Sequence, residues 1–315
     1  MSEHELAALG AGEVLVRTMF SGVSTGSELL AYRGELDPEL PLDDTIGALG
    51  GTFRYPFRYG YSCVGAIETS TCDLSEGTVV FAFQPHQDRF VAAADEIVPL
   101  GSVDPRAATL FPLVETALQV TLDAGHRIEE TVIVIGLGAV GMLTATLMQR
   151  SGARVLAIEP LGWRRATATR LGISAVAPEG VADELFTMGA ADGVPLVIEA
   201  SGSPDALAGA LPLLAHEGMA LVASWYGTKQ VQLPLGAEFH RRRLTIRSTQ
   251  VSTIPARLSD RWTKDRRRRA ACDLLEQLPL DELATHTFPF ERAAEAFAAI
   301  DEGRNGLMHA ALGYD

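Results

Sequence analysis

The sequence predicts an α/β fold in which a doubly wound parallel sheet is inserted between two parts of a β-rich domain. Three observations support this prediction. Residues 131–250 alternate apolar strand-like runs with helical segments, and residues 13–100 hold short strand-like runs between Gly, Pro and Asp. Residues 136–141 form the pattern G-x-G-x-x-G directly after an apolar strand and before an amphipathic helix.

The N-terminal elements follow from short apolar runs. We expect strands at 14–16, 64–67 and 79–83. Residues 37–58 contain three prolines and three glycines, so we expect a long loop there. Its aromatic residues either line an apolar pocket or pack within an Ω-loop. Pro105 suits the first turn of a helix, and an Ala- and Leu-rich pattern extends that helix to 122.

The central segment alternates strands and helices, which indicates a parallel sheet with crossover helices. The expected strands are 132–135, 154–158, 194–198, 219–223 and 244–247. The expected helices are 139–150, 163–171 and 205–214. Nearer the end of the sequence we expect a charged helix at 265–278, a second helix at 293–301 and a strand at 307–312.

Composition excludes several classes of partner. A net charge of −14 repels nucleic acid and anionic membranes. No apolar run approaches the ~18 residues that span a bilayer, and the acidic first residues lack the basic and apolar regions of a signal peptide. We therefore expect a cytoplasmic protein that binds a small molecule and has no nucleic-acid or membrane partner. The three cysteines are far apart in sequence, so neither disulfides nor a cysteine zinc cluster is expected.

The glycine pattern predicts a dinucleotide site. Gly136 would form the tight turn, Gly138 would let the backbone approach a pyrophosphate, and Gly141 would let the helix pack on the strand. Ala139 and Val140 begin the following helix, whose N-terminus offers free N–H groups to phosphates. Strand, glycines and helix in this order make the signal specific.

Side chains after the later strands indicate which nucleotide binds. Glu159 ends the second strand about twenty residues after the glycines, and a carboxylate there accepts ribose hydroxyls and repels a 2′-phosphate, which favours NAD. Arg164 either holds the 2′-phosphate of NADP or lies solvated or paired with Glu159. Ser201 and Trp225 follow strands at their carboxyl ends, where a doubly wound sheet binds its cofactor. Trp225 could equally be a packed aromatic at a domain boundary.

Several segments are typical of one known family. They are 22–24 (G-V-S), 60–62 (G-Y-S), 136–141, 197–202 (V-I-E-A-S-G) and 288–297. With these motifs the chain resembles the medium-chain dehydrogenase/reductase superfamily over nearly its whole length. Residues 21–28 are most similar to the bacteriochlorophyllide dehydrogenase-like branch, whose members serve varied secondary metabolism. The resemblance implies a GroES-like β-barrel catalytic domain at 1–115 and 255–315, a Rossmann dinucleotide-binding domain at 116–254, and a homodimer.

The zinc ligands of this family are not matched here. Zinc-dependent members use a Cys, a His and a later Cys or acid, but the matching positions are Ser24, Tyr61 and Ser62, and Glu115 alone fits an acidic ligand. Neutral hydroxyls are poor zinc ligands beside thiolate and imidazole. The four-cysteine structural zinc lobe is also missing from the sequence. We therefore expect no zinc. Thr116 stands where the resemblance implies contact with a nicotinamide.

The resemblance implies hydride transfer, which builds negative charge on a carbonyl oxygen. Tyr61 is our first candidate for the group that gives the oxygen a proton in reduction and takes it back in oxidation. Ser24 and Thr25 would hydrogen-bond the substrate oxygen. His86 is a candidate proton relay or a packing residue. Glu115 is either a buried remnant or an acceptor for a substrate hydroxyl.

The leading functional hypothesis is a zinc-independent, NAD(P)-dependent alcohol dehydrogenase or carbonyl reductase. Its substrate would be a polyol, a sugar-like molecule or a secondary metabolite. The alternatives are a reductase of an activated C=C bond and a non-redox descendant that binds nucleotide. The arginine runs 241–243 and 266–269 have acidic neighbours, so we interpret them as solvated helix faces.

Overall fold

The structure is a computed structural model that describes residues 5–315. The chain divides into two compact units, one formed by the residues up to Pro112 together with Arg269–Asp315, the other by Leu113–Arg268. The second unit extends past the expected boundary at 254, because Arg257 and Arg267 bond to the helix that begins this unit. The assignment of catalytic and cofactor-binding domains at the expected boundaries stays a prediction.

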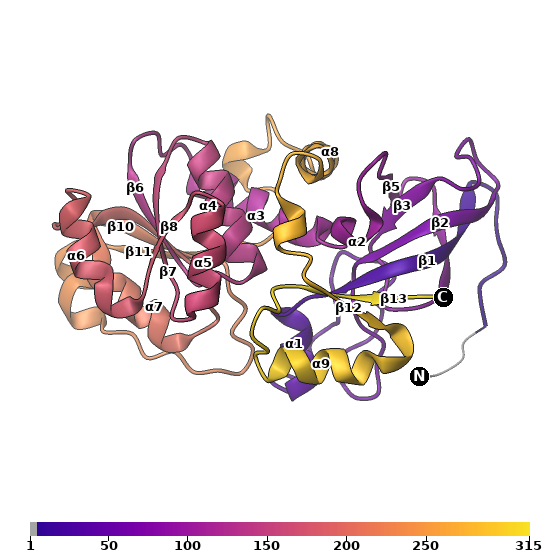
Figure 1. The fold of residues 1–315 in the computed structure, drawn as a ribbon, viewed down its shortest axis with the longest axis horizontal. Coiled ribbons are helices and arrows are strands. Elements are labelled where there is room, and N and C mark those ends of the chain that lie inside the picture. Colours follow the sequence, from indigo (N-terminus) through magenta and orange to yellow (C-terminus); the bar gives the residue numbers. More distant parts are fainter. Residues whose placement is uncertain (1–4) are drawn as a thin grey trace. The chain divides into compact units, whose positions relative to one another are not determined.

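The second unit is built on a six-stranded, fully parallel sheet (Figure 1). Its order is β11-β10-β9-β6-β7-β8. The strands are β6 (Thr131–Ile135), β7 (Arg154–Ile158), β8 (Ser174–Val176), β9 (Val194–Glu199), β10 (Leu214–Val222) and β11 (Thr245–Ser248). The chain runs outward from β6 to β8, returns to β9 beside β6, and runs outward again to β11. The predicted α/β class with a doubly wound parallel sheet is confirmed.

Helices connect these parallel strands. They are α4 (Ala139–Arg150), α5 (Gly162–Arg170), α6 (Val181–Thr187) and α7 (Pro204–Ala210). All five residues of β6 are buried, as expected for a central strand covered on both faces. The helix expected at 205–214 ends earlier, because the chain passes through a short 3₁₀ turn and enters β10 at Leu214.

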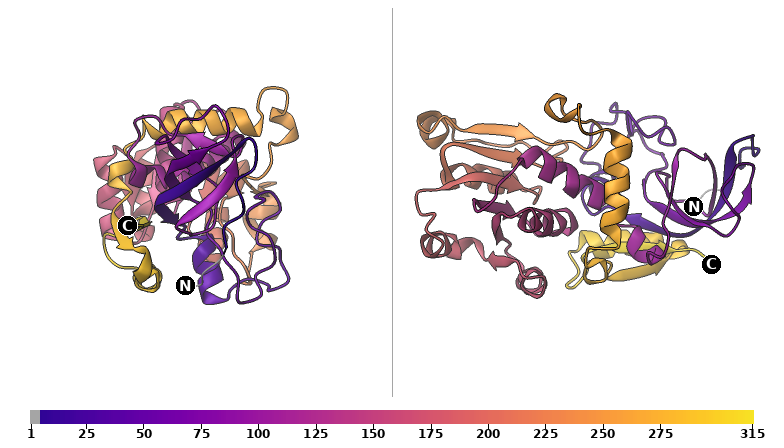
Figure 2. Two further views of the ribbon diagram at one scale, coloured as in Figure 1. Left: turned by 90° about the vertical axis from the view of Figure 1, so that its right-hand side faces the viewer. Right: turned by 90° about the horizontal axis from the view of Figure 1, so that it is seen from above.

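The first unit contains a seven-stranded mixed sheet of order β12-β13-β1-β2-β3-β5, with β4 paired to β1. The strands are β1 (Glu13–Val23), β2 (Cys63–Ser70), β3 (Val79–Ala82), β4 (Arg89–Ala93), β5 (Ile97–Pro99), β12 (His286–Pro289) and β13 (Ala310–Gly313). Strand β1 pairs with β4, β2 and β13 along its length. Figure 2 shows how β1, in indigo, and β13, in yellow, bring the two ends of the sequence into one sheet.

The helix expected from 105 to 122 is two helices, α2 (Pro105–Ala108) and α3 (Phe111–Ala124). The Asp104 side chain caps α2 by accepting the Ala107 N–H at 2.9 Å. Pro112 lacks an N–H and restricts the residue before it, so a continuous helix would lose a hydrogen bond here. The remaining helices are α1 (Ser27–Arg33), α8 (Lys264–Leu275) and α9 (Ala293–Asp301).

The loop over 37–58 is packed. Leu36, Leu42, Leu49 and Phe53 are buried against Leu30 of α1, so the Ω-loop interpretation describes its interior. Of the helices in the described part of the chain, none is both long and apolar enough to cross a membrane.

Candidate functional site

The turn between β6 and α4 has the geometry expected of a dinucleotide loop. Gly136 has φ +90°, and a Cβ there would lie 2.6 Å from the Cα of Ser201. A Cβ on Gly141 would lie 1.9 Å from the carbonyl oxygen of Gly136, so glycine is required for α4 to pack. Gly138 caps α4 and faces open space, with nothing within 4 Å of an added Cβ. Ala139 and Val140 lie in the first turn, where N–H groups have no intrahelical partner.

Glu159 supports this turn from the end of β7. Its side chain is 2 % exposed, and its two oxygens accept the N–H groups of Leu137 at 2.8 Å and Leu161 at 2.9 Å. Arg164 Nη1 lies 3.6 Å from Glu159 Oε2, so these two side chains form an ion pair. Whether either side chain contacts a nucleotide stays a prediction.

A second buried carboxylate stands at the end of the neighbouring strand β9. Glu199 is fully buried and accepts hydrogen bonds from the Ser201 N–H at 2.6 Å, the Ser201 hydroxyl at 2.5 Å and the Tyr226 hydroxyl at 2.6 Å. Burial and this hydrogen bond raise the pKa of Tyr226. Trp225 beside it is 44 % exposed. Glu199 was not among the site residues predicted from the sequence, although it is an acid that ends a strand, the same signal that identified Glu159.

Glu115 lies on α3 in a buried ion pair. Its Oε1 accepts from Arg267 Nε at 3.0 Å, and both side chains are almost fully buried. Arg267 also donates to Gln119 Oε1 at 2.6 Å. The interpretation of 266–269 as a solvated face is therefore wrong for Arg267. Thr116 follows Glu115 on the same helix, and the predicted roles of both residues stay predictions.

Three hydroxyl groups gather in the first unit, where β1 ends and α1 begins. The hydroxyls of Tyr61 and Ser27 are 2.8 Å apart, and Ser27 donates to Ser24 Oγ at 3.2 Å. Burial, with the nearby Glu28 carboxylate adding, raises the pKa of Tyr61 to about 12, so the phenol keeps its proton at neutral pH. The structure thus unites Tyr61 with Ser24, and it adds Ser27, which sequence analysis missed.

Two other candidate residues, Ser62 and Thr25, form no hydrogen bond with the hydroxyls of Tyr61, Ser27 and Ser24 within the described part of the chain. Ser62 turns away and donates to the Thr109 carbonyl at 2.7 Å. Thr25 is half-buried beside Ser24. The cluster of Tyr61, Ser27 and Ser24 is called the hydroxyl cluster below.

His86 belongs to a buried polar chain next to the hydroxyl cluster. Its Nε2 lies 2.8 Å from Glu28 Oε2, and its Nδ1 lies 2.7 Å from Ser21 Oγ, which in turn lies 2.8 Å from the Tyr314 hydroxyl. Because a carboxylate only accepts, Nε2 carries a proton. The other oxygen of Glu28 accepts the Ser24 N–H at 2.8 Å. Glu28 therefore joins His86 to the backbone of the hydroxyl cluster.

Comparison with known proteins places this geometry in a class. The family model described as zinc-binding dehydrogenase matches residues 139–266. D-guloside 3-dehydrogenase of Escherichia coli (strain K12) is 26% identical, over 94% of this chain and 91% of that protein. L-galactonate-5-dehydrogenase of the same strain is 26% identical, over 64% of this chain and 57% of that protein.

Solved structures share the fold over the whole chain. The alcohol dehydrogenase TADH from Thermus sp. ATN1 has a TM-score of 0.75 at 21% identity and covers 100% of this chain and 96% of its own. Galactitol-1-phosphate dehydrogenase from E. coli has a TM-score of 0.77 at 18% identity, over 99% and 95% of the two chains. The alcohol dehydrogenase rspB from E. coli CFT073, solved with NADH, has a TM-score of 0.76 at 17% identity, over 98% and 94%.

The family model, the dehydrogenase relatives and the shared fold support the predicted membership of the medium-chain dehydrogenase/reductase superfamily, a class of nicotinamide-dependent oxidoreductases. The fold, the dinucleotide turn and the motifs agree on this assignment.

Proposed function

We propose that this protein is a zinc-independent alcohol dehydrogenase or carbonyl reductase that uses NAD(H) and acts on a polyol or sugar-like substrate. The observation that carries the proposal is the hydroxyl cluster. Tyr61 and Ser24 hold two positions where the family's zinc ligands stand, and they share hydrogen bonds with Ser27. The intact dinucleotide turn supports retained hydride chemistry.

The residues at the family's zinc position do not fit zinc. A tyrosine or serine side chain binds zinc strongly only when it is deprotonated, yet burial raises the pKa of Tyr61 to about 12, and serine hydroxyls are weaker acids still. Within residues 5–315 no group of three or more His, Cys, Asp and Glu side chains is arranged to hold a metal ion. We therefore assign no step of the reaction to a metal.

The residues around the dinucleotide turn fit a nicotinamide nucleotide. The open face of Gly138 and the first turn of α4 would receive the pyrophosphate, and Glu159 would accept the adenosine ribose hydroxyls. Its carboxylate disfavours a 2′-phosphate, which supports NAD, whereas Arg164 is the group that would accommodate NADP.

The bound nicotinamide would supply or accept the hydride. In reduction, the Tyr61 hydroxyl donates its proton to the substrate oxygen as the carbon receives the hydride, so a carbonyl becomes an alcohol. The phenolate regains its proton from water, and Ser27, which is hydrogen-bonded to both Tyr61 and Ser24, is placed to relay it by giving one proton as it receives another. Oxidation runs through the same atoms in reverse. Glu28 positions the cluster by holding the Ser24 N–H, and His86 keeps Glu28 in place.

The substrate class is supported by the names of relatives. D-guloside 3-dehydrogenase and L-galactonate-5-dehydrogenase are named for sugar derivatives, and galactitol-1-phosphate dehydrogenase for a polyol phosphate. We include a cytoplasmic location, a role in secondary metabolism and a homodimeric state in the proposal. A monomeric mass in solution would remove the last of these.

Fluorescence titration with NADH and NADPH tests the cofactor, and a panel of polyols, sugars and ketones then tests turnover. Tyr61→Phe should lower kcat by about 10²- to 10⁴-fold, the usual contribution of a positioned general acid. Tyr32→Phe, which removes the hydroxyl of an exposed ring on α1, is the matched control and should turn over normally. Activity should survive exhaustive chelation. Zinc at one equivalent with activity lost on its removal would overturn the zinc-independent mechanism.

A further inference from the structure

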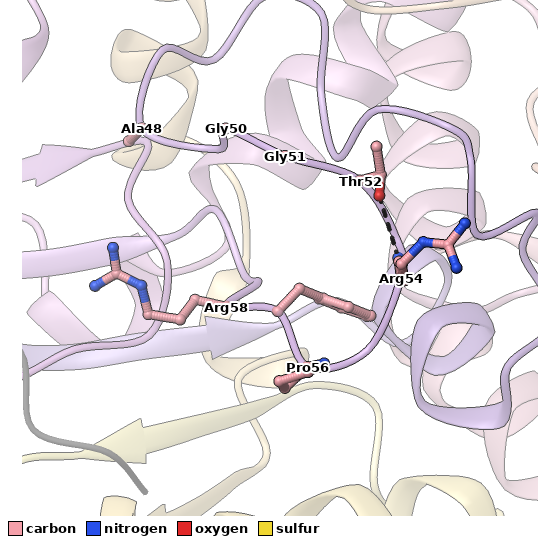
Figure 3. A pocket seen from close by; sticks show the side chains of 8 residues that line it. Ala48, Gly50, Gly51, Thr52, Arg54, Pro56 and Arg58 are labelled. Atoms are coloured by element: carbon pink, nitrogen blue, oxygen red, sulfur yellow. Dashed lines mark hydrogen bonds between the residues drawn. The ribbon is translucent and has the colours of Figure 1, made fainter.

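The surface of the loop over 37–58 holds a pocket of about 430 Å³ (Figure 3). Its lining combines a backbone edge at Gly50 and Gly51, an apolar part at Pro56 and Phe57, and a cation at Arg58. Of the two alternatives for the aromatic residues of this loop, packing describes its interior. The pocket on its surface is mixed in polarity, and Phe57 alone of those aromatic residues lines it.

The apolar part of this pocket is held in place by ring contacts. The ring centroid of Phe57 lies 5.6 Å from Phe53, 4.8 Å from Tyr55 and 6.2 Å from Tyr59. Phe53 is buried in the loop's own core. A ligand therefore meets a formed surface and does not have to order it, which lowers the entropic cost of binding.

Arg58 is an exposed cation that has no hydrogen-bond or ion-pair partner among the described residues. Arg54, the other arginine of the pocket, is paired with Glu39. Figure 3 shows the two guanidinium groups pointing away from each other. In a protein of net charge −14, a cation left unpaired beside a cavity is a local site for an anion.

The backbone edge adds donors. A Cβ on Gly50 or Gly51 would meet nothing within 4 Å, so a ligand can reach the main chain there. The N–H groups of both glycines form no backbone hydrogen bond within residues 5–315, whereas the Gly51 carbonyl accepts the Leu42 N–H at 3.0 Å. A guanidinium with backbone N–H donors suits a carboxylate or a phosphate, both of which accept several hydrogen bonds.

The pocket and the hydroxyl cluster lie at the two ends of a row of packed rings. Centroids of Phe57 and Tyr59 are 6.2 Å apart, and those of Tyr59 and Tyr61 are also 6.2 Å apart. Phe57 thus lies two ring contacts from the proposed proton donor, within one packed loop of the first unit.

We propose that this pocket is an anion subsite of the substrate site. Arg58 and the Gly50–Gly51 edge hold the carboxylate or phosphate of a polyol or sugar derivative, and Phe57 carries its apolar C–H face. The subsite rests on the proposed function for its substrate class. Its binding chemistry stands on the loop alone.

Calorimetric titration of the full chain tests the subsite with three ligands: D-glucitol, D-gluconate and D-glucitol 6-phosphate. We expect at least one anionic ligand to bind about ten-fold more tightly than neutral glucitol, the effect of one good charged contact. Arg58→Ala should remove that preference, and Arg54→Ala should keep it. Raising the salt concentration to about 1 M should also reduce it, because the site is exposed. Both arginines are exposed, so neither variant threatens folding.

Two results would overturn the subsite: equal affinity for all three ligands in the wild-type chain, or an anion preference that persists in Arg58→Ala. Binding and turnover measurements also distinguish a failure of the subsite from a failure of the proposed function. Arg58-dependent anion binding without turnover of any substrate would leave the subsite standing and remove the redox proposal. Turnover of anionic substrates with a KM unaffected by Arg58→Ala would do the reverse. The carboxylate and phosphate ligands distinguish which anion is held.

Discussion

Substitution by alanine should have different effects at two glycines of the dinucleotide turn: a loss of NADH affinity at Gly138 and a loss of stability at Gly141. At Gly138 the backbone has φ −66° and ψ −178°, which alanine adopts freely, and an added Cβ has nothing within 4 Å. The free energy of unfolding of Gly138→Ala should therefore stay within about 0.5 kcal/mol of wild type. The methyl group would stand where a pyrophosphate approaches the backbone, so NADH affinity should fall by about ten-fold or more.

Gly141→Ala should instead damage the fold. Its Cβ would lie 1.9 Å from the Gly136 carbonyl oxygen, whereas real Cβ contacts are essentially never under 3.0 Å. The turn and α4 must then separate by an ångström or more, and overpacking of this kind costs about 3 kcal/mol. For a unit of this size each kcal/mol shifts the Tm by roughly 2–4 °C, so we expect a loss of about 6–12 °C.

Differential scanning calorimetry and NADH fluorescence titration of both variants measure the two effects. The reasoning fails if Gly138→Ala binds NADH as tightly as wild type. It also fails if Gly141→Ala melts at the wild-type temperature, or if both variants lose equal stability.

Three further predictions concern buried charge and protonation. Arg267→Met removes the hydrogen-bonded partner of the buried Glu115 carboxylate and leaves only the longer 3.9 Å contact with Arg268, so chemical denaturation should show a loss of about 3 kcal/mol. Arg268→Met removes only that longer, partly exposed contact and should cost far less; equal costs would contradict this expectation. Burial lowers the pKa of His309 from 6.5 to about 4. The free energy of unfolding should therefore fall by about 3 kcal/mol as the pH drops from about 6.5 to 4, and His309→Gln should lose this contribution. The Tyr61 phenol has a pKa of about 12 and so keeps its proton, and the rate of ketone reduction should therefore stay constant from about pH 6 to 9. The rate of alcohol oxidation should rise with pH. A reduction rate that falls with an apparent pKa near 7 would exclude Tyr61 as the donor.

The parallel sheet was predictable from sequence because its strands are buried on both faces and appear as continuous apolar runs, such as 132–135. The need for glycine at 136 and 141 was predictable from the motif, and the structure shows that a Cβ at either position would collide with neighbouring atoms, whereas the predicted role of Gly138 stays a prediction. The break between α2 and α3 was harder, since the apolar periodicity continues across it and only Pro112 marks it.

Side-chain partners far apart in sequence were not predictable. Arg267 is buried because Glu115 lies 152 residues earlier, and nothing within its own arginine run distinguishes it. His86 meets Glu28 across 58 residues, so its environment could not be inferred from the loop in which it lies. Ser27 joins Tyr61 only after the packed loop returns the chain to α1.

The pairing of β1 with β13 also has a consequence for biosynthesis. Phe20–Val23 leave the ribosome long before Ala310–Gly313, the residues with which they pair. The second unit is one continuous segment, so it can fold while the first unit still waits for its closing strand. During that interval β1 presents an unpaired edge, which is a template for aggregation. Truncations and tags at the C-terminal end should therefore affect the yield of folded protein more than those at the N-terminal end.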